Sequence, residues 1–416
     1  MSMTVPATPS NIIDLTGQRI DLTNWAGWAS WWEGSLDMGS GITTGCLQPV
    51  RVINKERVER GQIFRLSMPS VVDTGEKSLT RIANARVAPK NKPASALGAG
   101  EFVHRMPNER FEHLVGDLAN LEGEHPTDMK GVPARYWGEH IKVIAQTVFG
   151  AIIPDLKAEI RMNFCMPFSL YTPENKEIAT ANLDNLYYCY VNEVYHELDI
   201  RVGSVIPEGY AAIRRYGDRN GNNVAIDIGD RTTEIIFAKG YQLSSRDSDG
   251  KLYGVRQVIE AIQEEFATTH GKSLEIEDVR VLLKAYTSRV RLPRLKVPRG
   301  GVDGYLDSDA QYEIISRKIF PVARALATFT RATLNKEGSE IGSNLDTATI
   351  YGGGGYLFYS PLRDGITGDP ELENGVLDLY LPPEAEYLNA SYMLEAVATQ
   401  TKIAMDRNIN LWERKR

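Results

Sequence analysis

The sequence predicts an α/β protein with more than one subdomain. Segments with the spacing of strands and segments with the spacing of helices alternate along the chain, which is typical of α/β folds. The chain has 416 residues, enough for two or three domains at roughly 100–200 residues each. Hydrophobic residues make up 42% and charged residues 24%, a balance that excludes a fibrous or wholly disordered chain.

The charge and the cysteine content of the chain limit the classes of function that the sequence allows. The formal net charge of −7 argues against direct binding to nucleic acid as the main activity. Cys46, Cys165 and Cys189 form no CxxC pair and no disulfide framework, so we expect reduced, mostly buried thiols. The six histidines lack metal-ligand spacing. No apolar run reaches the ~20 residues that span a bilayer, and the N-terminus lacks a secretory signal. We therefore expect a cytoplasmic protein with no membrane partner.

Four of the six tryptophans stand close together near the N-terminus. The spacing of Trp25, Trp28 and Trp32 would place them on one helical face, with Trp31 beside them. One interpretation, which we favour, is a helix docked on the body of the protein. The other is a surface for a partner or a second copy, since tryptophan is enriched at interaction hot spots.

The first half of the chain alternates strands with one clear helix. Residues 36–65 have apolar segments separated by glycines and turns, which predict strands. Residues 70–135 are polar and weakly periodic, so we expect a small variable subdomain or long loops. A helix that ends at Pro154 is predicted next, followed by a half-buried strand that ends at Pro167. Their apolar positions are Ile141, Ile144, Ala145, Val148 and Ile152 for the helix, and Ile160, Met162, Phe164 and Met166 for the strand.

The second half repeats this alternation. Residues 186–206 have the pattern of one or two strands, and residues 224–240 that of a strand, a tight turn and a strand. Residues 287–304 are basic and broken by Pro and Gly, which suits either a solvated loop or a contact surface. A further strand runs into Gly352, and helices are expected at 207–217, 254–266, 311–334 and 384–406.

Three glycine-rich turns each follow a short apolar strand. They are Asp37-Met-Gly-Ser-Gly-Ile-Thr-Thr, Asp227-Ile-Gly-Asp-Arg-Thr-Thr and Tyr351-Gly-Gly-Gly-Gly-Tyr. Glycine lets backbone N–H groups approach phosphate oxygens closely, and an aspartate at a strand end can hold Mg²⁺, directly or through water. A single such turn is equally typical of an ordinary β-hairpin. Two Asp-x-Gly turns, however, predict two similar half-domains that face one another across a nucleotide. The P-loop and Rossmann motifs are absent from the sequence.

In this order, the turns resemble the motifs of the actin-like ATPase superfamily, which includes actin, the seventy-kilodalton heat-shock chaperones and sugar kinases. The turn at Asp37 is similar to the first phosphate loop and the turn at Asp227 to the second. The strand that runs into Gly352–Gly355 is similar to the adenosine motif. The segment Pro207–Ala212 resembles the first connecting helix, in which Glu208 takes the place of the residue that positions the attacking water. Its alternative is a solvated glutamate favoured by the helix dipole.

Within this superfamily, the sequence is most similar to the bacterial plasmid-segregation actins of the ParM type. Three segments carry that resemblance: Asn163–Tyr171, the Pro-Glu-Gly-x-Ala-Ala start at Pro207, and Glu386–Tyr392. Two positions depart from the pattern. Thr44 stands where actin-type loops often carry a lysine that reaches the phosphates. Arg231 stands where glycine is frequent, and it either contacts phosphate or points outward.

The resemblance implies an actin-like fold, in which two related α/β domains, each with a smaller inserted subdomain, flank a nucleotide cleft. It implies an N-terminal extension at 1–35, and domain I at 36–223, with a variable subdomain at about 60–135 and completed by 385–416. Domain II then spans 224–384, with its subdomain at about 250–335.

The implied activity is hydrolysis of ATP, or GTP, with Mg²⁺. Glu208 and Asp227 are the implied catalytic residues, and Asp37 and Asp227 hold Mg²⁺ through water. The nucleotide-binding residues are expected to be Asp37, Gly39, Ser40, Gly41, Thr43, Thr44, Gly229, Asp230, Arg231, Thr232, Gly353, Gly354, Gly355 and Tyr356.

The implied partners are other copies of the chain in a nucleotide-dependent filament, and a DNA-binding adaptor for plasmid segregation or cytoskeletal positioning. Two alternatives have no filament. A small-molecule kinase is expected to show a catalytic Asp base and a sugar-binding loop, of which we find no clear example. A chaperone-like ATPase is expected to carry a substrate-binding domain after the ATPase unit.

Overall fold

The computed structural model describes residues 12–18, 20–39, 41–54, 57–75, 97–98, 100–109, 112–123, 125–127, 136–299, 302–334, 345–367, 379–409 and 411–412. The chain divides into two compact units. The first unit comprises Pro9–Glu208 with Asn389–Arg416, and the second contains Gly209–Leu388. The units therefore meet in the sequence at Glu208, whereas the sequence-based boundary follows residue 223. None of the described helices is both long and apolar enough to cross a membrane.

The first unit is built on a mixed sheet that has eleven strands among the described residues. Its strands are β1 (Ile12–Asp14), β2 (Trp31–Met38), β3 (Ile42–Asn54), β4 (Arg57–Arg60), β5 (Ile63–Pro69), β6 (Val72–Gly75), β7 (Glu101–Arg105), β8 (Glu112–Gly116), β9 (Lys157–Met166), β10 (Leu186–Val191) and β11 (Val194–Pro207). Its helices are η1 (Thr23–Trp25), α2 (Asp117–Glu122), α3 (Glu139–Ile152), η4 (Phe168–Leu170), α4 (Pro173–Leu183) and α10 (Leu388–Asp406). The strand order is β1-β5-β3-β2-β9-β11-β10-β7-β8-β6, with β4 paired to β3.

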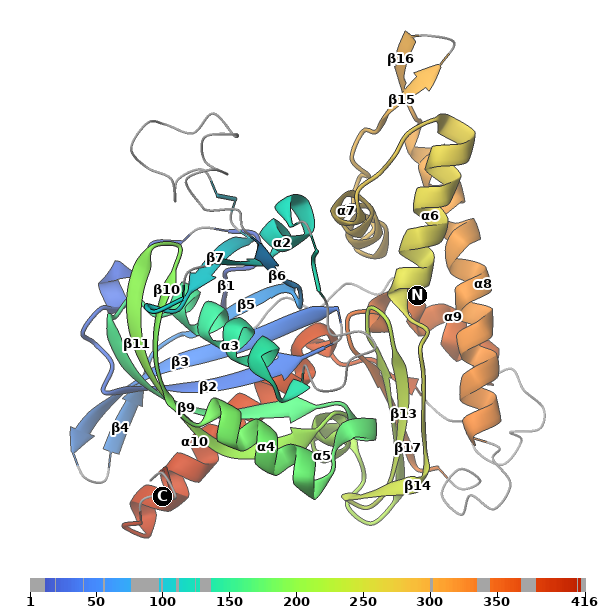
Figure 1. The fold of residues 1–416 in the computed structure, drawn as a ribbon. Helices are drawn as coiled ribbons and strands as arrows, with labels where there is room; N and C mark the ends of the chain where they lie inside the picture. The colour runs from blue at the N-terminus through green and yellow to red at the C-terminus, as the bar shows by residue number, and fades with distance from the viewer. Residues whose placement is uncertain are drawn as a thin grey trace. The chain divides into compact units, whose positions relative to one another are not determined.

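Helices α3 and α10 cover opposite faces of this sheet, as Figure 1 shows. A Cβ atom on Gly45 of β3 would lie 2.3 Å from Val148 of α3. The next residue, Cys46, packs instead against Ala390 and Leu394 of α10. Because successive residues of a strand point to opposite faces, β3 supplies both helices with a packing surface. The helix and strand predicted on either side of Pro154 are confirmed as α3 and β9.

The tryptophans do not form the helical face that their spacing predicts. Strand β2 begins at Trp31, and η1 covers only the three residues that end at Trp25. Trp32 is fully buried beside Phe64, and Trp25 packs edge-on against the same ring at 5.6 Å between centroids. The helix prediction is wrong because pairing with β3 and β9 makes this segment a central strand. Tertiary pairing outweighs local spacing here.

The region 70–135 contributes strands to the same sheet. In its described part, β7 pairs with β10, β8 pairs with β7, and β6 pairs with β8 at the sheet edge. Helix α2 packs against β7 and β8. Residues 76–96 lie outside the described part of the chain, as do residues 1–11 of the predicted N-terminal extension.

The second unit holds a five-stranded sheet in the order β14-β13-β12-β17-β18 and a two-stranded hairpin. Its strands are β12 (Asn222–Ile228), β13 (Thr233–Lys239), β14 (Gln242–Lys251), β15 (Lys296–Arg299), β16 (Val302–Tyr305), β17 (Thr347–Tyr351) and β18 (Leu379–Tyr380). Its helices are α5 (Tyr210–Tyr216), α6 (Val255–His270), α7 (Ile276–Thr287), α8 (Ser308–Leu334), α9 (Gly355–Thr367) and η6 (Ala385–Tyr387).

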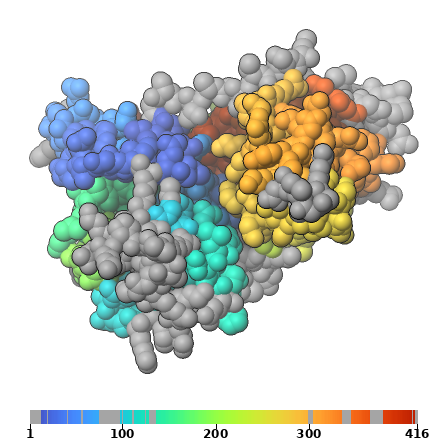
Figure 2. All heavy atoms as spheres, turned by 90° about the horizontal axis from the view of Figure 1, so that it is seen from above, coloured from blue at the N-terminus to red at the C-terminus, as the bar shows by residue number. Residues whose placement is uncertain are grey.

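Helices lie on both faces of this second sheet. Gly209, just before α5, lies against Ile236 of β13, whereas the neighbouring Ile235 and Phe237 join the core formed with α6, α8 and α9. Figure 2 shows the yellow and orange residues of α6 to α8 gathered into one body. The helices predicted at 254–266, 311–334 and 384–406 are confirmed as α6, α8 and α10. The helix predicted from residue 207 begins only at Tyr210, because β11 continues to Pro207.

His104 of β7 makes the stability of the fold depend on pH. Its ring is fully buried and hydrogen-bonds Gln146 of α3 at 3.1 Å. Burial is the main cause that lowers the pKa of His104 from 6.5 to about 4. The neutral ring is therefore the form that the folded state favours. Below pH 6.5 the unfolded chain binds a proton that the folded chain resists, so stability is lost as the pH falls toward 4.

We predict that the wild-type protein loses up to about 3 kcal/mol of unfolding free energy between pH 6.5 and pH 4 through this group. Urea unfolding at a series of pH values measures the loss. His104→Gln is expected to flatten the dependence, while the control His125→Gln, at an exposed position, leaves it unchanged. If the unfolding free energy of His104→Gln depends on pH as strongly as that of the wild type, this account is contradicted.

Candidate functional site

Three parallel strands of the first unit bring polar side chains to one edge of the sheet. Strands β2, β9 and β11 are parallel neighbours, with Asp37 paired to Cys165 and Pro207 paired to Met166. The chain leaves β11 at Glu208, whose backbone N–H donates to the Met166 carbonyl at 2.9 Å. Ligands of α/β proteins bind at the carboxyl ends of parallel strands. This edge is therefore a candidate site.

One carboxylate oxygen each of Asp37 and Glu208 and the Cys165 Sγ atom, which are atoms that could bind a metal ion, all lie within 4.8 Å of one another. Glu208 is only 8% exposed, and Cys165 is buried. The solvated alternative for Glu208 is therefore wrong. Glu208 lies before α5 rather than within a helix, because β11 continues to Pro207 and α5 begins only at Tyr210.

Asp37 is surrounded by hydrogen-bond donors. The Cys165 thiol donates to its Oδ1 atom at 2.7 Å, and the side chain of Asn389, at the start of α10, donates as well. Burial raises the pKa of Asp37, and these two hydrogen bonds oppose the shift. Burial, and then the charges of Asp37 and Glu208, raise the pKa of the Cys165 thiol well above its usual range. The thiol therefore stays protonated and serves as a donor.

The sequence did not identify Cys165 and Asn389 as site residues. Strand alternation was the available signal for Cys165, because it must face opposite Phe164 and Met166, on the side that α10 covers. Asn389 belongs to a segment that carried the family resemblance, but no local pattern connects it to Asp37. The expectation of reduced, buried thiols is confirmed for Cys46, Cys165 and Cys189.

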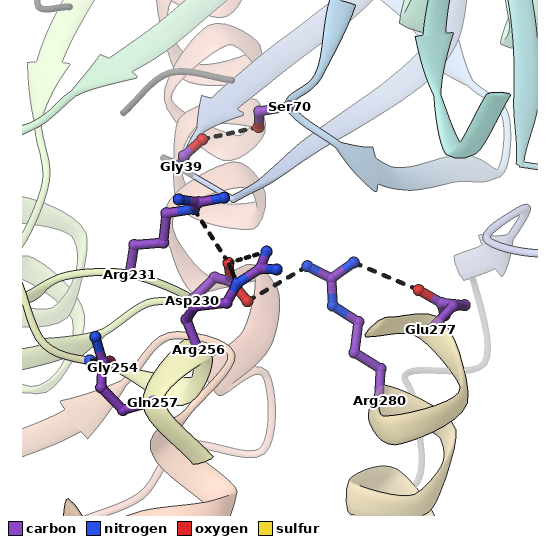
Figure 3. Close-up of polar contacts among 9 residues, drawn as sticks. All are labelled: Gly39, Ser70, Asp230, Arg231, Gly254, Arg256, Gln257, Glu277 and Arg280. Carbon is purple, nitrogen blue, oxygen red and sulfur yellow. Dashed lines mark hydrogen bonds and ion pairs between the residues drawn. The ribbon is translucent and has the colours of Figure 1, made fainter. Parts of the chain in front are cut away.

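The first glycine-rich turn joins β2 to β3. Its backbone is tight, since a Cβ atom on Gly39 would lie 2.6 Å from the Ile42 carbonyl oxygen. The Ser70 hydroxyl donates to the Gly39 carbonyl at 2.8 Å (Figure 3). The Ser70 N–H donates to the Gly41 carbonyl at 3.0 Å. Ser40 lies outside the described residues.

The two threonines of this turn already have partners in the sheet. The Thr43 hydroxyl lies 2.7 Å from that of Ser70, and the Thr44 hydroxyl lies 2.9 Å from that of Ser67. Both threonines are buried. Their role in phosphate binding stays a prediction.

The second and third turns lie against each other in the second unit. Strands β12 and β17 are parallel, with Asp227 paired to Tyr351. Gly352 has a φ of +83°, and a Cβ atom there would lie 2.3 Å from an Asp227 carboxylate oxygen. The Gly354 N–H donates to the Ile228 carbonyl at 2.7 Å. The structure thus brings together the second phosphate-loop candidate and the adenosine-motif candidate.

The remaining predicted residues flank these turns. The Gly229 N–H donates to the Thr232 carbonyl at 2.8 Å and closes the β12–β13 hairpin, with Asp230 and Arg231 at its tip. Gly355 begins α9, a helix that the sequence did not predict because glycines precede it and Pro361 lies inside it. The Tyr356 hydroxyl donates to the Pro382 and Pro383 carbonyls, and burial raises the pKa of Tyr356 to about 12.

The donor set in the first unit suits Mg²⁺. This ion prefers oxygen ligands and takes one or two carboxylates together with waters. Asp37 and Glu208 supply two carboxylates in close reach of each other, and each carboxylate accepts several hydrogen bonds or metal-bound waters. The protonated Cys165 thiol is not a ligand for such an ion.

No family model matches this chain, and no curated protein matches it. Several solved structures, however, are similar to most of the chain. The chain resembles the archaeal actin homolog Ta0583 with a TM-score of 0.61 and 16% identity, over 88% of this chain and 99% of that one. It resembles the protein of a 15-stranded ParM filament from Clostridium botulinum with a TM-score of 0.58 and 17% identity, over 89% and 99%. It resembles Bacillus thuringiensis ParM with ATP with a TM-score of 0.56 and 15% identity, over 89% and 99%.

The chain therefore has the actin-like α/β fold. Among proteins with that fold, its structural neighbours include several ParM proteins. These structural similarities confirm the resemblance to actin-like proteins of the ParM type that the sequence predicts.

We predict that Gly352 is indispensable to the geometry of the second unit. Gly352→Ala forces a side chain into a left-handed conformation and against Asp227, so the unfolding free energy should fall by about 1–3 kcal/mol. Gly353→Ala is the matched control, since nothing lies within 4 Å of its Cβ position, and it should change stability by about 0.5 kcal/mol or less. Urea midpoints measure both. Equal midpoints for the two variants would contradict the packing argument.

Proposed function

We propose that the chain binds ATP with Mg²⁺ and hydrolyses it. The observation that carries the proposal is the pair of carboxylates, Asp37 and Glu208, at the carboxyl ends of parallel strands in an actin-like fold. Two structural neighbours support it, since the archaeal actin homolog Ta0583 was solved in complex with ADP and Bacillus thuringiensis ParM with ATP.

Two Asp-x-Gly turns, those after Asp37 and Asp227, carry this proposed activity. The backbone amides of the turns after Asp37 and Asp227 bind the phosphates, with the exception of the Gly229 N–H, which donates to the Thr232 carbonyl. Gly353, Gly354, Gly355 and Tyr356 line the adenosine. Asp37 would hold a hydrated Mg²⁺ through water, and the ion would neutralise phosphate charge; the same role for Asp227 stays a prediction from the sequence. The Cys165 and Asn389 donors fix the rotamer of Asp37, so that its remaining acceptor positions face the ligand.

Glu208 is the proposed positioning group for the attacking water. Its carboxylate accepts a hydrogen bond from that water and orients it toward the terminal phosphate. Phosphoryl transfer depends mainly on positioning and electrostatic stabilisation. A buried and rigidly attached glutamate suits this task, because the Glu208 backbone is tied to β9.

We predict that Glu208→Gln slows phosphate release by about 10- to 100-fold, since a neutral amide oxygen accepts a weaker hydrogen bond from the attacking water than a carboxylate does. ATP affinity should change little, because the backbone amides of the turns remain. The control is Glu177→Gln, at an exposed position on α4, and it should hydrolyse ATP at the wild-type rate. A wild-type rate in Glu208→Gln would remove Glu208 from this role.

We further propose that the chain assembles into filaments in response to ATP. The structural neighbour from Clostridium botulinum forms a 15-stranded filament. Hydrolysis then limits filament lifetime, because the loss of the terminal phosphate removes contacts that hold the bound conformation. Light scattering should rise when ATP and Mg²⁺ are added, and the signal should persist longer in Glu208→Gln than in the wild type.

A non-polymerising ATPase, either a small-molecule kinase or a chaperone-like protein, is the second candidate. The same light-scattering experiment separates the two, since no rise at high protein concentration would favour the second. Plasmid segregation, a DNA-binding adaptor, the choice between ATP and GTP, and a cytoplasmic location stay predictions from the sequence.

A further inference from the structure

The thiol of Cys165 lies beside two carboxylates, and the proposed hydrolysis uses it only as a hydrogen-bond donor. Its Sγ atom lies 2.7 Å from Asp37 Oδ1 and within 4.8 Å of a Glu208 carboxylate oxygen. The other two cysteines have apolar surroundings, because Cys46 packs against α10 and Cys189 lies in the core formed with α3. Cys165 is therefore the thiol that belongs to a group of three potential metal ligands.

Backbone pairing holds the three side chains in place. Asp37 of β2 pairs directly with Cys165 of β9, and direct partners on neighbouring strands point to the same face of a sheet. The Glu208 N–H donates to the Met166 carbonyl at 2.9 Å, which ties the third residue to β9 as well. Side chains supported by strands keep their positions more precisely than side chains on loops. The three donor atoms thus form a set that exists before any ion binds.

The separations between these donor atoms fit a tetrahedral ion. Zn²⁺ binds a thiolate at about 2.3 Å and a carboxylate oxygen at about 2.0–2.2 Å, so two ligands of one tetrahedral ion lie about 3.5 Å apart. The separations in the structure, from 2.7 Å between Cys165 Sγ and Asp37 Oδ1 to at most 4.8 Å, bracket that value. Small rotations of the side chains therefore bring all three donors within bonding distance of one ion.

The charge at this group also favours a cation. Among the residues that the structure describes, no lysine or arginine forms an ion pair with Asp37, and its hydrogen-bond donors are the Cys165 thiol and the Asn389 side chain. Glu208, only 8% exposed, adds a second carboxylate. Asp37 itself is partly exposed, so an ion can reach the group from solvent.

We propose that Asp37, Cys165 and Glu208 bind Zn²⁺, with a water molecule in the fourth position. On binding, the S–H bond of Cys165 breaks, its proton passes to solvent and the thiolate forms a bond to the ion. Mg²⁺ does not take this position, since it requires octahedral oxygen coordination and keeps several waters. The inference goes beyond the proposed function, because Zn²⁺ binding needs no nucleotide. Where the proposed function also holds, Zn²⁺ and Mg²⁺ compete for Asp37.

The test titrates Cd²⁺ into the nucleotide-free, full-length protein in the presence of a reductant that contains no thiol. A thiolate bound to Cd²⁺ gives an ultraviolet charge-transfer band, and soft ligands of this kind favour such ions. The wild type should gain the band at one Cd²⁺ per chain. An excess of Zn²⁺ should abolish the band by displacement, whereas the same concentration of Mg²⁺ should leave it in place.

Cys165→Ser should lose the band and bind Zn²⁺ at least about 100-fold more weakly, since losing only a hydrogen-bond partner of a metal ligand costs about 10- to 100-fold. Asp37→Asn and Glu208→Gln should each weaken Zn²⁺ binding by more than about tenfold. The matched control is Cys189→Ser, which removes a buried thiol of β10 and should bind both ions as the wild type does. Zn²⁺ should raise the urea midpoint of the wild type and of this control, but not that of Cys165→Ser.

Two results would overturn the inference. One is a wild-type protein that gains no band with Cd²⁺. The other is wild-type affinity for Zn²⁺ in Cys165→Ser, which would show that the ion binds elsewhere. Urea midpoints without metal show whether the variants fold. If Cys165→Ser does not fold, Asp37→Asn decides, and undiminished Zn²⁺ binding there has the same meaning. The proposed hydrolysis is tested separately, because these titrations contain no ATP.

Discussion

The convergence of three strand ends in the first unit is the constraint on which the candidate site depends. Parallel pairing of β2, β9 and β11 places Asp37, Cys165 and Glu208 at one edge, with their donor atoms within 4.8 Å. Two carboxylates this close repel each other in a poorly solvated environment. The thiol of Cys165 and the amide of Asn389 offset part of that cost at Asp37, and a bound cation would offset more. Strain of this kind is typical of functional sites.

In the second unit, two glycine-rich turns lie in contact with each other, and glycine residues make that contact possible. Gly352 and Gly354 allow the turn after β17 to lie directly on the end of β12, where any side chain would displace Asp227 or Ile228. The tip of the β12–β13 hairpin is in turn fixed by α6 and α7, because Arg256 and Arg280 donate hydrogen bonds to Asp230. The glycines thus serve packing in this structure, and their proposed role toward a nucleotide depends on that packing.

Sequence patterns predicted the parts of the fold that follow from local periodicity. Helix α3 and strand β9 have apolar positions at regular spacing, and Pro154 and Pro167 mark their ends, so both were predicted correctly. The tryptophan segment was predicted incorrectly because its spacing fits a helix while its sheet partners impose a strand. Helix α9 was not predicted, since its stability comes from the burial of Phe358 and Leu362 in the core. At the site, Asp37 and Glu208 stand in recognisable motifs, but Cys165 and Asn389 reach Asp37 only through tertiary structure.

The central claim is that Asp37 acts through a magnesium-bound nucleotide. Calorimetric titration of ATP into the wild-type protein and Asp37→Asn, each with and without Mg²⁺, tests it most directly. The account predicts saturable binding to the wild type that weakens when Mg²⁺ is removed, and little effect of Mg²⁺ on Asp37→Asn. Binding that is equally tight in all four titrations, or no binding to the wild type, would contradict it.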